Sequence, residues 1–196
     1  QNSKDPYEAY NGAMTLFNMD VDKLIYRPVA KVYHAITQPP FRKGIVNVFD
    51  NIRTTTTLPN DLLQGKLRFV LVDITRFLVN STIGIGGLFD VATKLKLPKH
   101  DNDFGRTLAF YSHNKQSPYF VIPFFGPSTL RDAFALPFDI LTTLITYLND
   151  PVLLYSLAGL TLVSQRAEYL DSDSYLYDAF DPYAALRSAY LDSRNK

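Results

Sequence analysis

The segment of residues 76–92 constrains the fold more than any other part of the chain. Residues 77–89 carry no charge, yet they include a polar Asn-Ser-Thr step and three glycines, Gly84, Gly86 and Gly87. Inside a helix, each glycine costs about 0.5–1 kcal/mol relative to alanine. The pattern fits backbone that bends at apolar depth, as in a re-entrant segment or a lipid-facing cavity wall. It fits equally a buried helix that ends at Gly84 and turns through Gly87.

Size and composition narrow the class of protein. A chain of 196 residues is long enough for one domain with a real core, so we predict a single domain over residues 1–196. The net charge of +1 gives no reason to expect a nucleic-acid partner. The absence of cysteine excludes disulfides, thiol catalysis and thiolate metal sites, and it fits an oxidising compartment.

Helix signals recur along the chain. Three Asp-Pro pairs, at Asp5, Asp150 and Asp181, each predict a helix start, because proline lacks only an amide that is unpaired there. Apolar residues at helical spacing predict a first helix that ends or kinks near Pro28. Gln38-Pro39-Pro40 predicts the end of the next one. Two further apolar stripes follow, at residues 41, 45, 48 and 52 and at residues 67, 71, 74 and 78.

Strands have little support in the sequence. Only residues 119–122 read as a strand, and the prolines on either side argue against a central position in a sheet. We therefore predict an all-α fold.

Two long uncharged runs, residues 116–130 and 151–165, raise the question of a membrane. Neither reaches the ~20 residues that a single helix needs to cross a bilayer. At ~1.5 Å per residue, a fifteen-residue helix covers roughly 22 Å, which suits one leaflet or a protein interior. The chain is thus either a soluble helical domain with a large core or a protein that lies partly in one leaflet.

Candidate chemistry is sparse. His34, His100 and His113 are each isolated, so we predict no metal site, and residues 100–103 read as a solvated loop. No Gly-x-Ser-x-Gly elbow is present, and Ser128 is predicted to cap a helix. The glycines of residues 84–87 lack the spacing of a nucleotide loop. We predict no cofactor and no enzymatic activity.

An ordered series of motifs resembles the MlaA (VacJ) family of outer-membrane lipoproteins of Gram-negative bacteria. The resemblance runs over nearly the whole chain. Its motifs are Asp5-Pro6-Tyr7-Glu8, Arg27-Pro28-Val29-Ala30, Arg42-x-Gly44-x-x-Asn47, Asn60-x-Leu62-Leu63-Gln64-Gly65, Arg76-Phe77-x-x-Asn80-Ser81-Thr82-x-Gly84-x-Gly86-Gly87-x-x-Asp90-Val91-Ala92, Asp103-Phe104-Gly105-x-Thr107-Leu108, Pro118-Tyr119, Pro123-x-x-Gly126-x-Ser128-x-x-Arg131-Asp132, Leu170-Asp171-Ser172-Asp173 and Asp181-Pro182-Tyr183.

The resemblance implies a ring-like, all-helical protein embedded in the inner leaflet of the outer membrane, at its periplasmic face. An amphipathic central channel would pass mislocalised phospholipid from the outer leaflet to a periplasmic carrier, MlaC, and so maintain lipid asymmetry. Trimeric outer-membrane porins are the implied partners. The family's lipid-attached cysteine is absent from this sequence, so we expect it upstream of Gln1.

Site residues follow from the same resemblance, each with an alternative role in the core. Two arginines, Arg76 and Arg131, are candidates for lipid phosphates, or for pairing with carboxylates such as Asp90 and Asp132. Gly84, Gly86 and Gly87 are predicted to be structural bends. The predicted channel residues are Asn47, Val48, Phe49, Asn80, Thr82, Phe120, Phe124 and Phe125.

Two rival functions stay open at this point. One is a structural scaffold that organises porins without conducting lipid. The other is a lipid hydrolase or acyltransferase, against which the missing nucleophile motif argues. In one place the chain departs from the family: residues 112–117 lack the glycines common before the Pro-Tyr pair, which predicts a stiffer or differently placed loop.

Overall fold

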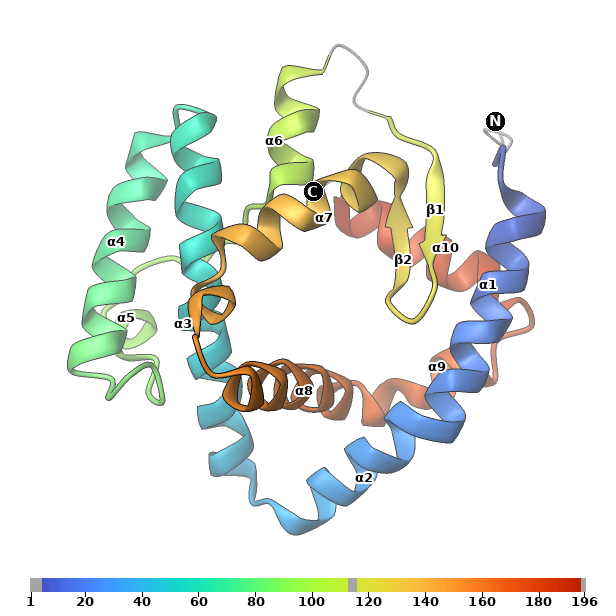
Figure 1. Cartoon of the computed structure of the whole chain (residues 1–196), viewed down its shortest axis with the longest axis horizontal. Helices are drawn as coiled ribbons and strands as arrows, with labels where there is room; N and C mark the ends of the chain where they lie inside the picture. The colour runs from blue at the N-terminus through green and yellow to red at the C-terminus, as the bar shows by residue number, and fades with distance from the viewer. Residues whose placement is uncertain (1–4, 113–115, 195–196) are drawn as a thin grey trace.

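Helices in a ring make up most of this computed structural model, which describes residues 5–112 and 116–194 (Figure 1). The predicted all-α class is confirmed. The elements are α1 (Glu8–Val21), the π-helical turn η1 (Asp22–Tyr26), α2 (Arg27–Ile36), α3 (Pro39–Leu63), α4 (Leu67–Thr82), α5 (Val91–Lys94), α6 (Phe104–Tyr111), β1 (Tyr119–Ile122), β2 (Gly126–Thr129), α7 (Leu130–Thr142), the 3-10 turn η2 (Leu144–Tyr147), α8 (Pro151–Glu168), the 3-10 turn η3 (Leu170–Ser172), α9 (Asp173–Tyr177) and α10 (Pro182–Arg194).

Two of the three Asp-Pro pairs start helices as predicted. Asp150 Oδ1 accepts hydrogen bonds from the amides of Val152 and Leu153, at 2.8 and 3.2 Å, and caps α8. Asp181 Oδ1 accepts one from the amide of Ala184 at the start of α10. The first pair instead precedes a turn, and α1 begins only at Glu8.

The predicted interruption near Pro28 takes the form of a π-helical turn. Residues 22–26 widen the helix by one residue per turn, and the chain then continues as α2 with Pro28 in its first turn. A π-bulge is a recognised cause of a helix bend. The stop at Gln38-Pro39-Pro40 is confirmed, since α2 ends at Ile36 and Pro39 opens α3.

A small β-hairpin stands between α6 and α7. The predicted strand β1 is confirmed, and it pairs antiparallel with β2, with Tyr119 opposite Thr129. No sequence pattern predicted β2. The predicted cap at Ser128 is wrong, because Ser128 lies within β2 and the Oγ1 of Thr129 caps α7 by accepting from the amide of Asp132.

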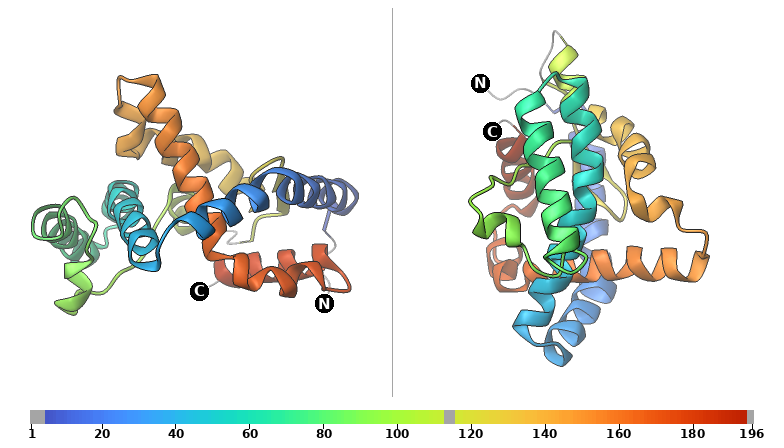
Figure 2. Two further views of the ribbon diagram at one scale, coloured as in Figure 1. Left: turned by 90° about the horizontal axis from the view of Figure 1, so that it is seen from below. Right: turned by 90° about the vertical axis from the view of Figure 1, so that its left-hand side faces the viewer.

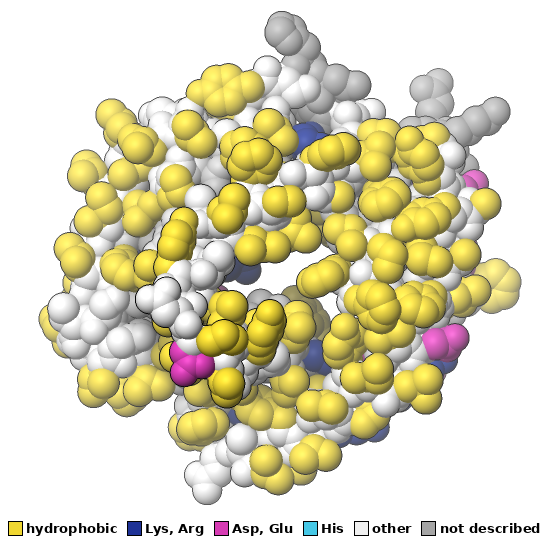
Figure 3. Space-filling model, viewed as in Figure 1, with side chains coloured by type: hydrophobic (Ala, Val, Ile, Leu, Met, Phe, Trp, Pro, Cys, Tyr) yellow, Lys and Arg dark blue, Asp and Glu magenta, His cyan; other side chains and the backbone are white. Residues whose placement is uncertain are grey.

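The elements enclose an opening at the centre of the molecule (Figures 1 and 3). We call α3 and α4 the wall, since they lie side by side at one edge, and α7, η2 and α8 the arm. Seen from below, the arm projects from one side of the ring, and α9 and α10 lie on the other (Figure 2). Among the described residues, no helix is both long enough and apolar enough to cross a membrane.

Burial in this fold is inverted relative to an ordinary water-soluble domain. Of the described residues, seven buried ones are hydrophobic and sixteen are polar or charged. The predicted stripe of α4 faces outward, with Leu67, Leu71 and Leu78 all exposed, whereas in the stripe of α3 only Phe41 is exposed and the other three residues are half-buried. The side chains that hold the helices together are therefore mainly polar, and the apolar ones are left on the surface.

Candidate functional site

The central opening and its apolar rim form the most distinctive surface. In the space-filling view the molecule is hollowed at its centre, and hydrophobic side chains cover most of the face around the hollow (Figure 3). Exposed apolar patches this extensive are unusual on a soluble monomer and mark contact with a membrane, ligand or partner. Among the exposed residues of the elements around it are Phe124 and Phe125 of the hairpin turn, Phe134 and Phe138 of α7, and Leu153 and Leu162 of α8.

Aromatic stacking fixes the hairpin against α1. Phe120 stacks on Tyr10 with ring centroids 5.2 Å apart, and Phe124 meets Phe17 edge to face at 5.2 Å. Asn18 clamps the turn, donating to the carbonyl of residue 122 and accepting from the amide of Phe124. This clamp holds Phe124 at a φ of 66°, and the neighbouring Phe125 is left 68% exposed.

The predicted channel residues of α3 lie beside the glycine turn. Asn47 donates from Nδ2 to the carbonyl of Leu88 at 3.1 Å. Val48 and Phe49 are half-buried. These contacts connect α3 to the segment that follows α4.

After α4 ends at Thr82, residues 83–89 form a turn of the kind that the sequence offered as one of its two alternatives. Gly86 and Gly87 have φ values of 67° and 94°, a region that favours glycine. At Gly84, a Cβ atom would lie 2.3 Å from the carbonyl oxygen of Phe89. A side chain at Gly84 would thus force the backbone of the turn apart.

Asn80 holds that turn to the helix and is buried. Its Oδ1 accepts from the amide of Ala92 at 2.9 Å and its Nδ2 donates to Asp90 at 3.1 Å. Thr82 is exposed and donates to the carbonyl of Leu78 within its own helix.

The structure places Arg76 with Asp90, the carboxylate that the sequence offered as an alternative to lipid. The guanidinium lies 3.0 Å from Asp90 Oδ1 and also donates to the carbonyl of Leu97 at 2.6 Å. Burial tends to raise the pKa of Asp90, but hydrogen bonds from Thr93 and Asn80 and the charge of Arg76 hold it below its usual value of 3.8. Arg76 therefore stabilises the turn through these buried contacts.

The second candidate arginine lies on α7, where Arg131 Nε is 3.4 Å from Asp132 Oδ1. Asp132 also accepts from Arg194 at 2.8 Å and from the hydroxyl of Tyr190 at 2.7 Å. This group ties the final helix α10 to the start of the arm.

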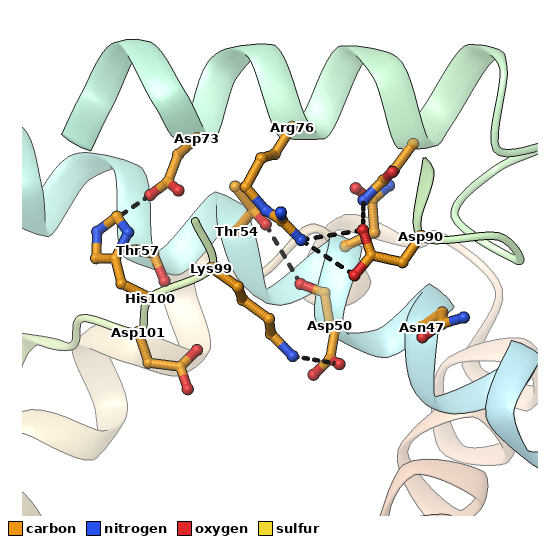
Figure 4. Close-up of a pocket in the computed structure, with 12 residues that line it drawn as sticks. Asn47, Asp50, Thr54, Thr57, Asp73, Arg76, Asp90, Lys99, His100 and Asp101 are labelled. Atoms are coloured by element: carbon orange, nitrogen blue, oxygen red, sulfur yellow. Dashed lines mark hydrogen bonds and ion pairs between the residues drawn. The ribbon is translucent and has the colours of Figure 1, made fainter. Parts of the chain in front are cut away.

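A polar cavity between α3, α4 and the segment after α5 brings together residues that the sequence did not connect (Figure 4). It offers about 20 Å³, room for about one water molecule. Asp73 and His100 line it, and Asp61 lies behind His100. Burial, opposed by His100 and reinforced by Asp61, raises the pKa of Asp73 to about 6.

This cavity corrects two predictions. His100 is not isolated, because its Nε2 lies 2.5 Å from Asp61 Oδ2. Residues 100–103 are not a solvated loop, since Asn102 is buried and donates to Asp61, and Asp103 caps α6. No helical spacing in the sequence links residues 61, 73 and 100, so only the packing of three separate segments reveals the cluster. His113 lies outside the described residues, as does the middle of the loop predicted to be stiffer.

The structure is that of an all-helical, ring-shaped protein with a polar interior and an apolar face. Comparison with known proteins gives its family. A model of the MlaA lipoprotein family matches residues 3–196, and this chain belongs to that family.

Individual relatives cover nearly all of the chain. The intermembrane phospholipid transport system lipoproteins MlaA of Shigella flexneri and Escherichia coli K12 are 36% and 35% identical to it, over 97% of this chain and 77% of theirs. An uncharacterized protein of Rickettsia prowazekii is 34% identical over 97% of this chain and 76% of its own. A solved structure from work on the maintenance of bacterial outer membrane lipid asymmetry superposes with a TM-score of 0.83, at 33% identity over 97% of each chain.

Proposed function

We propose that this protein is a non-enzymatic phospholipid channel of the outer membrane. It removes mislocalised phospholipid from the outer leaflet and passes it to a periplasmic carrier, MlaC, beside trimeric porins. The observation that carries the proposal is the inverted burial: polar side chains hold the helices together while apolar ones cover the face around a central opening. The relatives named for intermembrane phospholipid transport support the same substrate.

The energetics of lipid transfer explain why such a surface is needed. Exposing an acyl chain to water costs ~0.8 kcal/mol per methylene, so two long chains cost on the order of 20 kcal/mol. A protein that moves a phospholipid must cover the tails with apolar side chains and keep the headgroup wet. The aromatic residues Phe120, Phe124 and Phe125 supply apolar cover at the hairpin, and Asn47 supplies a polar group on α3.

Contact between Arg76 and a lipid headgroup would cost free energy, because Arg76 already has a carboxylate partner. Its guanidinium is already paired with Asp90 and nearly buried, so meeting a lipid phosphate would require that pair to open. Its first role in the proposal is therefore to hold the glycine turn, and Arg131, which lies 3.4 Å from Asp132, would likewise have to leave a carboxylate to meet a phosphate.

The experiment reconstitutes the protein in proteoliposomes with phospholipid labelled in one leaflet and MlaC outside. We expect protein-dependent delivery of whole lipid to the carrier, with its chemistry checked by mass spectrometry. Release of lysophospholipid or free fatty acid would show a hydrolase instead. No delivery by inserted protein that still binds a porin would show a scaffold.

Two matched variants locate the path. Phe125→Asp places a charge on the exposed hairpin turn, and Phe180→Asp places one on a fully exposed residue between α9 and α10. We expect the first to lower lipid delivery at equal insertion, and the second to leave delivery unchanged. Equal rates for both variants would argue against the hairpin as part of the path.

A further inference from the structure

Three side chains from separate segments converge at the polar cavity of the wall. Asp73 of α4 and His100 of the segment that follows α5 line the cavity (Figure 4), and Asp61 of α3 contacts His100. The imidazole Nε2 lies 2.5 Å from Asp61 Oδ2 and 3.4 Å from Asp73 Oδ2. One ligand atom from each residue lies within 4.8 Å of the others.

Among the described residues, the two carboxylates of this cluster have no cationic side chain beside them except the imidazole. Asp61 and Asp73 are 0% and 2% exposed. Within the part of the chain that the structure describes, neither has a lysine or arginine within ion-pair distance. The other three carboxylates that line the cavity each have one, in the pairs Asp50–Lys99, Asp90–Arg76 and Asp101–Arg53. Two buried negative charges are thus left to share one imidazole, which burial makes costly.

Asp73 presents a buried carboxylate oxygen to the cavity (Figure 4). Its Oδ2 lies 3.4 Å from His100 Nε2 and accepts no hydrogen bond from the residues that the structure describes. Asp61, by contrast, accepts from Asn102 Nδ2 at 2.7 Å, which orients its carboxylate toward His100.

Two carboxylates and one imidazole form a donor set of known preference. Ca²⁺ and Mg²⁺ prefer oxygen ligands alone, whereas imidazole suits Zn²⁺ and its neighbours. Zinc takes three protein ligands and a water in many tetrahedral sites, with bonds of about 2.0–2.2 Å. The cavity beside Asp73 and His100 has room for about that one water.

We propose that Asp61, Asp73 and His100 bind a divalent transition-metal ion, with Zn²⁺ the best fit, and that the ion fastens the segment after α5 to the wall. Binding moves the carboxylates apart by a fraction of an ångström from the short contact with Nε2. Because the unfolded chain does not hold these three residues together, metal binding adds to the stability of the fold.

The test uses the full chain in detergent, stripped with a chelator and titrated with Zn²⁺ by calorimetry. We expect one ion per chain and a rise in melting temperature. Co²⁺ serves as a second probe, because its visible absorption bands report a tetrahedral site with oxygen and nitrogen ligands. Asp73→Asn and His100→Gln should each weaken Zn²⁺ binding at least tenfold and abolish the Co²⁺ bands.

The matched control is His34→Gln, which removes an exposed imidazole on α2 and should leave both signals unchanged. Either of two results would overturn the proposal. One is a folded wild-type protein that binds no Zn²⁺ at micromolar concentration. The other is binding that survives both cluster variants, which would place the ion on the surface. If Asp73→Asn does not fold, the His100→Gln variant alone decides between these outcomes.

Discussion

The wall and the arm both border the central opening, yet different forces place them. The wall buries polar side chains, such as Asn51, Thr57 and Asn60 of α3, each with a hydrogen-bond partner on another turn or segment. The arm exposes apolar side chains and buries little: α8 buries only Ser164 and Ala167. A hydrogen-bonded wall needs particular partners at particular distances, whereas an apolar arm needs only a medium that accepts it.

In the outer part of the arm, η2 and α8, side-chain bonds to the rest of the ring lie at the two ends. At one end Thr56 Oγ1 of the wall lies 3.0 Å from Thr143 Oγ1. At the other, Arg166 pairs with Asp22 and Asp173. Of the described residues between 144 and 164, side chains form hydrogen bonds only within the arm. We therefore expect the fold of the wall to depend on its hydrogen bonds and the position of the arm to depend on an apolar medium.

The largest effect is expected from removing the cation, Arg166, that holds the end of α8. Arg166→Ala removes the cation that lies 2.6 Å from Asp22 and 2.7 Å from Asp173. Among the described residues, this leaves Asp22 without an ion-pair partner and Asp173 with Arg27 alone. Removing one partner of a mostly buried pair costs about 3 kcal/mol. We expect that loss in the free energy of unfolding, measured by denaturant titration in detergent. Arg166→Lys keeps the charge and should lose less, so equal losses would show that packing, not charge, matters.

The second prediction concerns whether the arm contacts lipid. The arm and α9 lie on opposite sides of the ring (Figure 2). Tyr155 of α8 is 74% exposed and Tyr175 of α9 is 83% exposed. Tyr155→Glu should lower binding to phospholipid vesicles by about 2.5 kcal/mol, roughly 70-fold, because the ring would no longer enter lipid. Tyr175→Glu should change binding little in the same flotation assay. Similar losses for both would remove the distinction between the two sides.

A third prediction sharpens the account of the wall. Asn80→Leu leaves the buried amide of Ala92 without an acceptor and removes one donor to Asp90. An unsatisfied buried group of this kind costs about 2 kcal/mol. Denaturant titration should show that loss, and Thr82→Val on the exposed side of the same turn should cost less than about 0.5 kcal/mol. A stable Asn80→Leu protein that fails only in lipid delivery would instead favour a role for Asn80 in the channel.

Local signals predicted the helices well because they act over a few residues. Asp150 caps α8 and the prolines at 39 and 40 open α3 regardless of what lies far away in the chain. Strand β2 was not predicted from the sequence because Gly126 and Pro127 carry no strand preference. Only pairing with β1 makes that segment extended.

The direction of the apolar stripes and the polar cavity lay beyond sequence reasoning for a different reason. A stripe such as Leu67, Leu71 and Leu78 gives the period of a helix, but whether it faces a core or lipid depends on the medium. The meeting of Asp61 with His100 depends on how three segments pack. Family resemblance supplied the ring, and no pattern in the chain alone would have done so.

The smallest expected effect is a pH-dependent change in stability that arises where α7 of the arm contacts α6. Burial, reinforced by the charges of Asp103 and Asp132, raises the pKa of Asp139 from 3.8 to about 6. A raised pKa means that folding favours the protonated carboxyl, so its contribution to stability is full below about pH 4 and is lost as pH rises through 6. Asp139→Asn keeps the oxygen that accepts from the amide of Phe104 and removes the charge.

The Asp139→Asn variant should be more stable than the parent by about 1 kcal/mol at pH 7.5, after discounting for solvent screening, and no more stable at pH 4. The difference between the two proteins, measured by denaturant titration across this range, cancels the titration of all other groups. A difference that stays constant with pH would show that folding does not raise the pKa of Asp139.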